Sequence, residues 1–113
     1  MGRQADENSE RRKRRSARMV LRIPLLVNTV DAPPQADWES VETILVSEHG
    51  GMLRAKRTFQ VGVTLDIRMK NKNLSAQARV VWTSPQITSQ GMELGFELID
   101  QDGFWDMKFP PDR

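Results

Sequence analysis

A strict alternation of apolar and polar side chains runs from Val61 to Met69, where every second residue is apolar. Side chains of a β-strand point alternately to the two faces of a sheet, so this pattern predicts a strand with one buried face. Other short segments show the same period between loops rich in Gly, Pro, Asn and Ser. The expected strands lie within 19–30 and over 39–46, 52–55, 61–69, 74–82 and 92–99. Six short strands at this spacing predict an all-β fold, either an antiparallel barrel or a sandwich.

The faces of these strands follow from alternation along each one. It places Leu45 on the same face as Thr43 in the second strand, and Trp82 on the same face as Val80 in the fifth. We therefore expect Trp82 to pack in the core or at a barrel end rather than to stack on a base. Pro24 interrupts the first strand, and because proline lacks a backbone N–H it predicts an edge strand or a bulge there.

Length and the distribution of apolar residues bound the number of domains. A chain of 113 residues can bury one modest core but not two. Residues 1–13 are polar almost throughout and bury too little to offset the entropy of ordering, so we expect a disordered basic N-terminal arm there and one domain over 14–113. Three aromatic residues within 103–111 predict a tail, or a single helical turn, that docks on this domain.

Several classes of function find no support in the composition. The absence of cysteine excludes disulfides and thiolate chemistry, and no catalytic triad or metal-ligand cluster can be assembled around the single histidine, His49. We predict a protein that is not an enzyme, holds no metal or organic cofactor, and exposes His49 in a turn. No apolar run approaches the roughly 20 residues of a membrane span, and no signal peptide is visible, so a soluble, cytoplasmic protein without membrane contacts is expected.

Charge is distributed unevenly along the chain. Residues 1–22 carry eight Arg and Lys residues against three acidic ones, whereas the remainder carries nine against twelve. A cationic run extends from Arg11 to Arg18 and ends at Arg22. The planar fork of a guanidinium matches a phosphate and can also stack on a flat base. The basic arm is therefore suited to an anionic ligand such as a nucleotide.

A second informative feature is the segment Ser47-Glu48-His49-Gly50-Gly51 between the second and third expected strands. We expect a tight turn here, with the paired glycines supplying positive φ angles. A serine hydroxyl beside glycines offers a small donor and acceptor while the exposed backbone approaches a ligand closely. Turn and arm together predict a clamp around an anionic ligand.

The arm and the turn resemble the two motifs of the PilZ domain family. Arg14 and Arg18 match its R-x-x-x-R motif directly before the first strand, although the pairs Arg11/Arg15 and Arg18/Arg22 fit the same spacing. We prefer Arg14 and Arg18, because this register leaves the segment from Met19 to open the barrel as in the family. Arg15 lies within the matched motif.

The turn is similar to the family's second motif, D/N-x-S-x-x-G. Ser47 and Gly50 occupy its Ser and Gly positions, but Leu45 stands where the family has Asp or Asn. The resemblance implies a six-stranded antiparallel PilZ-type barrel that binds cyclic di-GMP. It also implies a set of ligand-binding residues, namely Arg14, Arg15, Arg18, Ser47, Gly50 and Gly51.

These features favour a single-domain cyclic di-GMP receptor that passes its signal to a downstream protein partner through a conformational change. An alternative is a PilZ-like scaffold that no longer binds the nucleotide and acts through protein contacts, which Leu45 favours. A third reading, non-specific nucleic-acid binding through the arm, rests on the Lys/Arg excess alone and is opposed by the acidic body, so nucleic acid is not an expected partner. We expect a monomer or a weak dimer.

Overall fold

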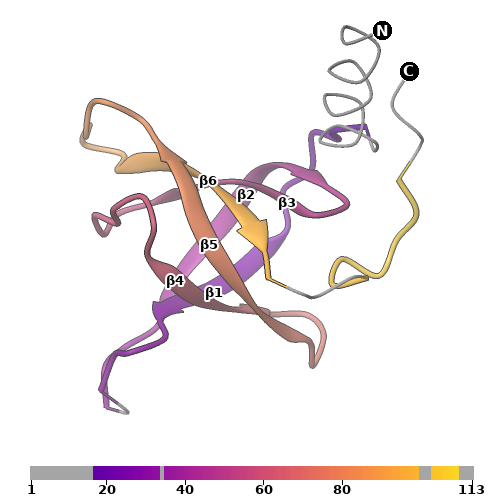
Figure 1. The fold of residues 1–113 in the computed structure, drawn as a ribbon, viewed down its shortest axis with the longest axis horizontal. Coiled ribbons are helices and arrows are strands. Elements are labelled where there is room, and N and C mark those ends of the chain that lie inside the picture. Colours follow the sequence, from indigo (N-terminus) through magenta and orange to yellow (C-terminus); the bar gives the residue numbers. More distant parts are fainter. Residues whose placement is uncertain (1–16, 34, 100–102, 110–113) are drawn as a thin grey trace, which may run out of the picture.

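The computed structural model describes residues 17–33, 35–99 and 103–109, and its architecture is all-β (Figure 1). Its strands are β1 (Pro24–Thr29), β2 (Glu39–Ser47), β3 (Gly50–Ala55), β4 (Thr64–Met69), β5 (Ser75–Thr83) and β6 (Met92–Leu98). All neighbours pair antiparallel in the order β1-β2-β3-β6-β5-β4, and β1 closes the ring by pairing with β4. The predicted six-stranded antiparallel barrel is confirmed. The described ranges contain no helix, and 103–105 form a turn.

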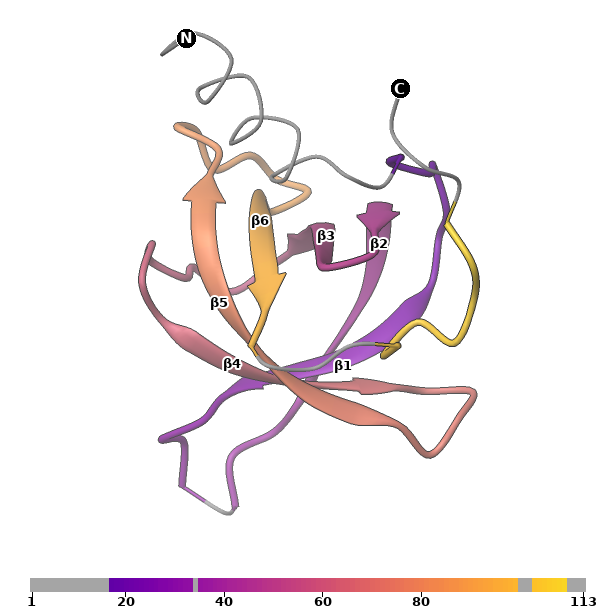
Figure 2. The ribbon, with the colours of Figure 1, turned by 45° about the vertical axis from the view of Figure 1, so that its right-hand side comes forward.

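Residues 17–23, here called the arm root, lead into β1 (Figure 2). The backbone N–H of Met19 donates to the carbonyl oxygen of Val46, and the Val46 N–H donates to the carbonyl oxygen of Met19, both at 2.8 Å. Pro24 is the first residue of β1, which pairs with strands on both sides. The prediction of an edge strand or a bulge was therefore wrong, because the first position of a strand also tolerates a missing N–H.

The side chain of Thr43 in β2 attaches the arm root to the barrel by two hydrogen bonds. Its side chain is 2% exposed, and its hydroxyl donates to the carbonyl oxygen of Leu21 at 2.6 Å while accepting from the N–H of Ile23 at 2.9 Å. The hydroxyl thus supplies hydrogen-bond partners for the Leu21 carbonyl and the Ile23 N–H. Leaving such groups buried without a partner would lower the stability of the fold. The arm root is thus fixed to the barrel wall. The arm itself, with Arg14 and Arg15, lies outside the described residues.

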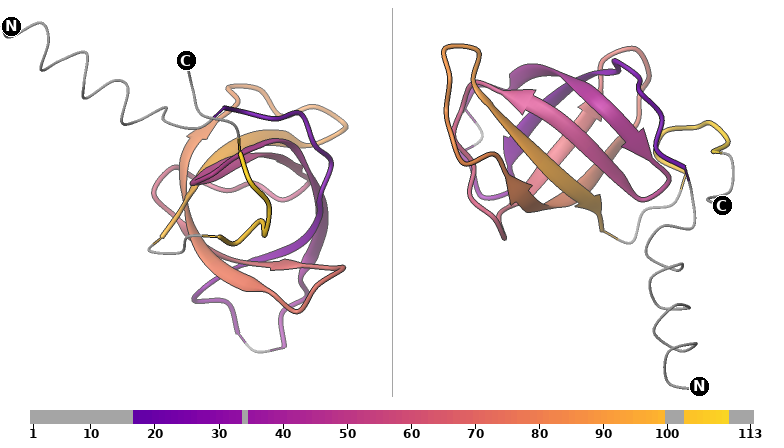
Figure 3. Two further views of the ribbon diagram at one scale, coloured as in Figure 1. Left: turned by 90° about the vertical axis from the view of Figure 1, so that its right-hand side faces the viewer. Right: turned by 90° about the horizontal axis from the view of Figure 1, so that it is seen from above.

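The barrel interior holds one hydrophobic core. Viewed along the barrel, the strands form a closed ring, and residues 103–109 lie across one opening (Figure 3, left). In this tail the ring of Trp105 packs against Phe104, with centroids 5.0 Å apart, and against Phe96 of β6 at 6.2 Å. All three aromatics are buried, which confirms the predicted packing of the tail. The largest fully buried aliphatic side chains are Leu25, Leu53, Leu65, Ile67, Leu94, Val27, Val46 and Val80.

A bulge at Ile44 reverses the facing of β2. The register against β3 shifts between Thr43 and Leu45, so that Val46 points inward with no exposed surface and Leu45 lies half-buried on the outer wall. The prediction that Leu45 shares the face of Thr43 was wrong, since a bulge depends on pairing with the neighbouring strand. As a consequence, Leu45 and Ser47 both face the outside of the barrel.

β5 contains a second bulge, at Val81. Val80 pairs with Phe96 of β6, and Trp82 pairs with the adjacent Gly95. Val81 between them therefore has no partner residue on β6. The bulge turns Trp82 outward, where it is 44% exposed. The prediction that Trp82 packs with Val80 was therefore also wrong, and a large aromatic ring stands on the outer wall.

Gly50 and Gly51 belong to β3 and not to the turn, which consists of Glu48 and His49. Neither glycine has a positive φ, so the conformational reason for expecting glycine here was wrong. The requirement is steric. A Cβ on Gly50 would lie 2.1 Å from the carbonyl oxygen of Phe96, and one on Gly51 would lie 2.8 Å from the carbonyl oxygen of Leu45. Only glycine allows the neighbouring strands to approach this closely.

Candidate functional site

A cavity of about 320 Å³ lies on the outer wall of the barrel over β2, β3, β6 and β5. Four of the residues predicted from the sequence line it: Arg18, Ser47, Gly50 and Gly51. The arm root and the β2–β3 turn, 29 positions apart between Arg18 and Ser47, are thus brought together as predicted. Leu45, at the departure from the family motif, lines the same cavity. Arg14 and Arg15 fall outside the described part of the chain.

Two rows of outward-facing cross-strand neighbours pass under this cavity, and every member of the two rows except Arg79 lines it. The polar row consists of Ser47, Gly50, Glu97 and Arg79 on β2, β3, β6 and β5. The apolar row, one step along the same strands, consists of Leu45, Met52, Gly95 and Trp82. Because opposite residues on one face of a sheet are direct neighbours, each row places its side chains next to one another. The cavity therefore has one polar side and one apolar side.

Two glycines create the hollow between these rows. Gly50 in the polar row and Gly95 in the apolar row lie on adjacent strands and lack side chains, so the wall sinks over them; we call this space the glycine cavity. It is bounded by Ser47 and Glu97 on the polar side and by Met52 and Trp82 on the apolar side. Ser47 and Glu97 stand two strand spacings apart, or about 10 Å.

Arg18 reaches the glycine cavity from the arm root. It precedes Met19, whose two backbone bonds to Val46 hold this part of the chain against β2. The side chain of Arg18 is exposed, so its guanidinium keeps its donors available for a ligand. The last arginine of the predicted motif is therefore held at the cavity by the attachment of the arm root.

Several residues of the cavity were given no binding role from the sequence, among them Trp82, Glu97 and His49. Trp82 was assigned to packing, Glu97 was given no role, and His49 was expected only to be exposed in a turn. His49 is in the turn and exposed as predicted, with its Nε2 atom 3.9 Å from the Glu48 carboxylate, but it also lines the cavity. Trp82 and Glu97 come from β5 and β6, far along the chain from both motifs. Only the register between strands connects them to Ser47 and Gly50.

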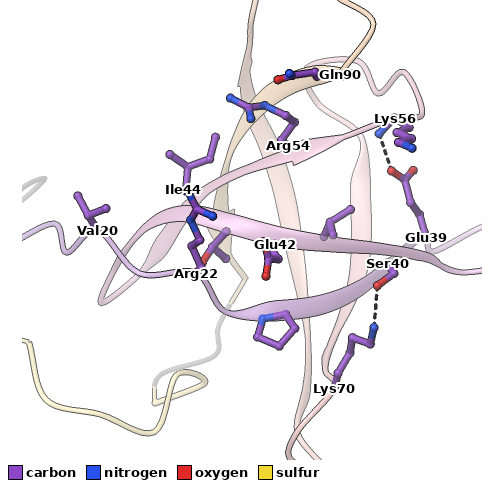
Figure 4. Close-up of a pocket in the computed structure, with 13 residues that line it drawn as sticks. Val20, Arg22, Glu39, Ser40, Glu42, Ile44, Arg54, Lys56, Lys70 and Gln90 are labelled. Carbon is purple, nitrogen blue, oxygen red and sulfur yellow. Dashed lines mark hydrogen bonds between the residues drawn. The ribbon is translucent and has the colours of Figure 1, made fainter.

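A larger groove of about 580 Å³ runs over the outer wall of β1, β2 and β3 (Figure 4). Three of its six charged side chains are engaged by the wall itself. Arg54 binds Glu93 at 2.7 Å, the Lys70 ammonium donates to the Ser40 hydroxyl at 2.7 Å, and the Glu39 carboxylate accepts from the backbone N–H of Lys56. None of the predicted ligand-binding residues in the described ranges lines this groove. We therefore place the candidate site at the smaller glycine cavity.

Two features that would point to other functions are absent from the described ranges. No group of three or more His, Cys, Asp or Glu side chains is arranged to hold a metal ion there. The same ranges contain no helix with the length and apolar character that crossing a membrane requires.

A family model matches the part of the chain that forms the whole barrel. The family model described as PilZ domain matches residues 12–103, which include the arm root, all six strands and the glycine cavity. Searches of curated proteins and of solved structures found no match. Domains of this family are receptors for cyclic di-GMP and not enzymes. Because the match spans well over half of the sequence, the chain belongs to the PilZ domain family.

Proposed function

We propose that this PilZ domain binds cyclic di-GMP in the glycine cavity. The observation that carries the proposal is the convergence of Arg18 from the arm root with Ser47 and Gly50 of the β2–β3 hairpin around one hollow. These residues come from the two family motifs. A cavity that joins them over a floor of glycines offers both a cation for phosphate and space for a base.

The chemistry of each side fits a part of the ligand. The Arg18 guanidinium can donate two parallel hydrogen bonds to a phosphate or lie flat on a guanine ring. Arg14 and Arg15, which precede it by four and three positions, would add further phosphate contacts. Trp82, at 44% exposure, offers an aromatic face, and stacking of a base on such a face contributes about 1–3 kcal/mol. Ser47 and the backbone at Gly50 and Gly51 then border the other part of the ligand.

Leu45 weakens this proposal at one contact. Its side chain cannot accept a hydrogen bond, whereas Asp or Asn at the same position of the family motif can. Loss of one such bond costs about 1–3 kcal/mol, or roughly 5- to 150-fold in affinity. Leu45 is also the observation that favours the alternative function, a PilZ scaffold that no longer binds the nucleotide and acts through protein contacts.

Binding would pass a signal through the arm. The arm root is already attached to β2 by Met19 and Thr43, so closure over the nucleotide would involve only the residues before it. An arm that closes over the ligand presents a different surface to a downstream protein partner, and ligand-dependent ordering of a segment is a common switching mechanism.

The test is a calorimetric titration of the full chain with cyclic di-GMP at physiological salt. We expect binding at micromolar concentration, lost in the double variant Arg14→Ala/Arg18→Ala. Arg54→Ala is the matched control, because Arg54 is also an exposed arginine but binds Glu93 away from the glycine cavity. GTP and short single-stranded DNA should give no comparable signal. Absence of binding by the unaltered protein would refute the proposal and leave the scaffold function.

A further inference from the structure

We propose that Glu97 recognises the Watson–Crick edge of a guanine in the glycine cavity, as a contact separate from the one at the position of Leu45. This inference rests on the proposed function, since it assigns one contact within the same site. It adds a specificity-determining residue on β6, outside both sequence motifs.

The chemistry of guanine sets the requirement. Its Watson–Crick edge presents two neighbouring donors, the ring N1–H and the exocyclic N2 amino group, beside the O6 acceptor. A carboxylate has two oxygens that accept side by side and carries no donor, so it matches this pair of donors. A charged acceptor also makes a stronger hydrogen bond than a neutral one. A guanine site without a carboxylate or amide at this edge would leave two polar groups unpaired.

Three described residues lining the cavity have side-chain acceptors: Ser47, His49 and Glu97. The serine hydroxyl and the imidazole each offer a single acceptor atom toward one donor. Glu97 alone among them offers two oxygens in one plane. In the apolar row, Leu45 and Met52 offer no oxygen or nitrogen at all. The carboxylate of Glu97 is therefore the side chain of this cavity that fits both donors of guanine.

Register and burial place Glu97 at the edge of the hollow. It is exposed on the outer wall and lies directly opposite Gly50, whose Cβ, if it had one, would be 3.2 Å from the Cα of Glu97. No side chain of the polar row therefore stands between Glu97 and Ser47. A base lying over Gly50 would present its edge to the Glu97 side of the cavity.

The carboxylate of Glu97 is also available. Within the described ranges it has neither a hydrogen bond nor an ion pair, whereas Glu93, four positions earlier on the same outward face of β6, binds Arg54 at 2.7 Å. Arg79 lies opposite Glu97 on β5 without an ion pair forming between them. Its positive charge would reduce the repulsion between this carboxylate and the phosphates of an anionic ligand.

Recognition by Glu97 predicts selectivity among cyclic dinucleotides. Adenine has an acceptor, the ring nitrogen N1, where guanine has a donor, so the carboxylate would face a lone pair. Hypoxanthine keeps the N1–H but lacks the N2 amino group, so it would lose one of the two hydrogen bonds. The expected order of affinity is cyclic di-GMP, then cyclic di-IMP, then cyclic di-AMP.

The experiment is a set of titrations of the full chain with cyclic di-GMP and cyclic di-IMP. Glu97→Ala should weaken binding of cyclic di-GMP by roughly 10- to 150-fold, the range for loss of a charged acceptor. It should also remove the preference for cyclic di-GMP over cyclic di-IMP, because the partner of the N2 amino group is then absent. Glu97→Gln should retain an intermediate affinity. Glu93→Ala should bind both ligands as the unaltered protein does.

The outcomes separate this inference from the proposed function. If the unaltered protein binds cyclic di-GMP but Glu97→Ala binds it equally well, or keeps the same preference over cyclic di-IMP, Glu97 does not read the base and the nucleotide site stands without it. If the unaltered protein binds neither ligand, the proposed function fails and this inference with it. Thermal melting of both Glu97 variants confirms folding, which an exposed position should leave unchanged.

Discussion

Replacement of Gly50 by alanine tests whether close strand approach, rather than a turn conformation, requires glycine in this site. The added Cβ would lie 2.1 Å from the carbonyl oxygen of Phe96, where ordinary contacts begin at 3.4 Å. The obstructing atom belongs to the backbone of β6 and cannot rotate away, so β3 and β6 must separate by more than 1 Å. Overpacking costs about 1–3 kcal/mol, and loss of one ladder hydrogen bond adds about 0.5–1.5 kcal/mol.

A destabilisation of about 2–4 kcal/mol should lower the melting temperature by roughly 10–30 °C in a domain of this size. The assay is thermal unfolding followed by circular dichroism. Gly95→Ala is the matched control, because its Cβ would meet Trp82 at an ordinary 3.6 Å. That variant should melt near the unaltered protein but bind the nucleotide more weakly, since a methyl group enters the glycine cavity. A Gly50→Ala protein that melts within 2 or 3 °C of the unaltered protein would refute the steric argument.

Three further predictions concern the site and its support. Leu45→Asp should raise the affinity for cyclic di-GMP by roughly 5- to 150-fold, because the carboxylate supplies a hydrogen-bond acceptor. The melting temperature should change little, since Leu45 is half-buried on the outer wall. Unchanged or lower affinity in calorimetry would contradict this prediction. Trp82→Ala should weaken the same binding by roughly 5- to 150-fold through lost stacking, and a full-affinity variant would show that the ring does not contact the base. Thr43→Val should leave the carbonyl of Leu21 and the N–H of Ile23 without their partner, lowering stability by about 1–3 kcal/mol and accelerating hydrogen exchange at Ile23; unchanged exchange there would argue against the tether.

The number of strands and most of the core could be predicted from the sequence, because the alternation of apolar and polar side chains is visible along each single strand. The segment 64–69 shows this clearly, with Leu65, Ile67 and Met69 buried as expected. The facing of Leu45 and Trp82 could not be predicted, since each depends on a bulge. A bulge is a mismatch in length between two paired strands, and neither strand alone contains that information.

The candidate site divides in the same way. Arg18, Ser47, Gly50 and Gly51, which line the cavity, could be grouped from the sequence because they belong to local motifs with recognisable spacing. Glu97 lines the same cavity but could not be grouped with them, because it becomes a neighbour of Gly50 only through the pairing of β3 with β6. For Gly50 and Gly51, the sequence indicated that glycine is required, but it did not reveal the physical reason for that requirement. The sequence pattern was read as a turn, whereas the requirement is contact between two backbones.

The attachment of the arm root determines the effective local concentration of Arg14 and Arg15 at the glycine cavity. Thr43 and the backbone bonds of Met19 anchor the chain directly beside the glycine cavity. Arg14 is four residues before Arg18, so the two Cα atoms can be no more than about 14 Å apart. A group tethered so closely has an effective local concentration in the millimolar range. If Arg18 binds a phosphate as proposed, engagement of the same ligand by Arg14 and Arg15 would be an intramolecular step, so even weakly binding arginines would add to the affinity.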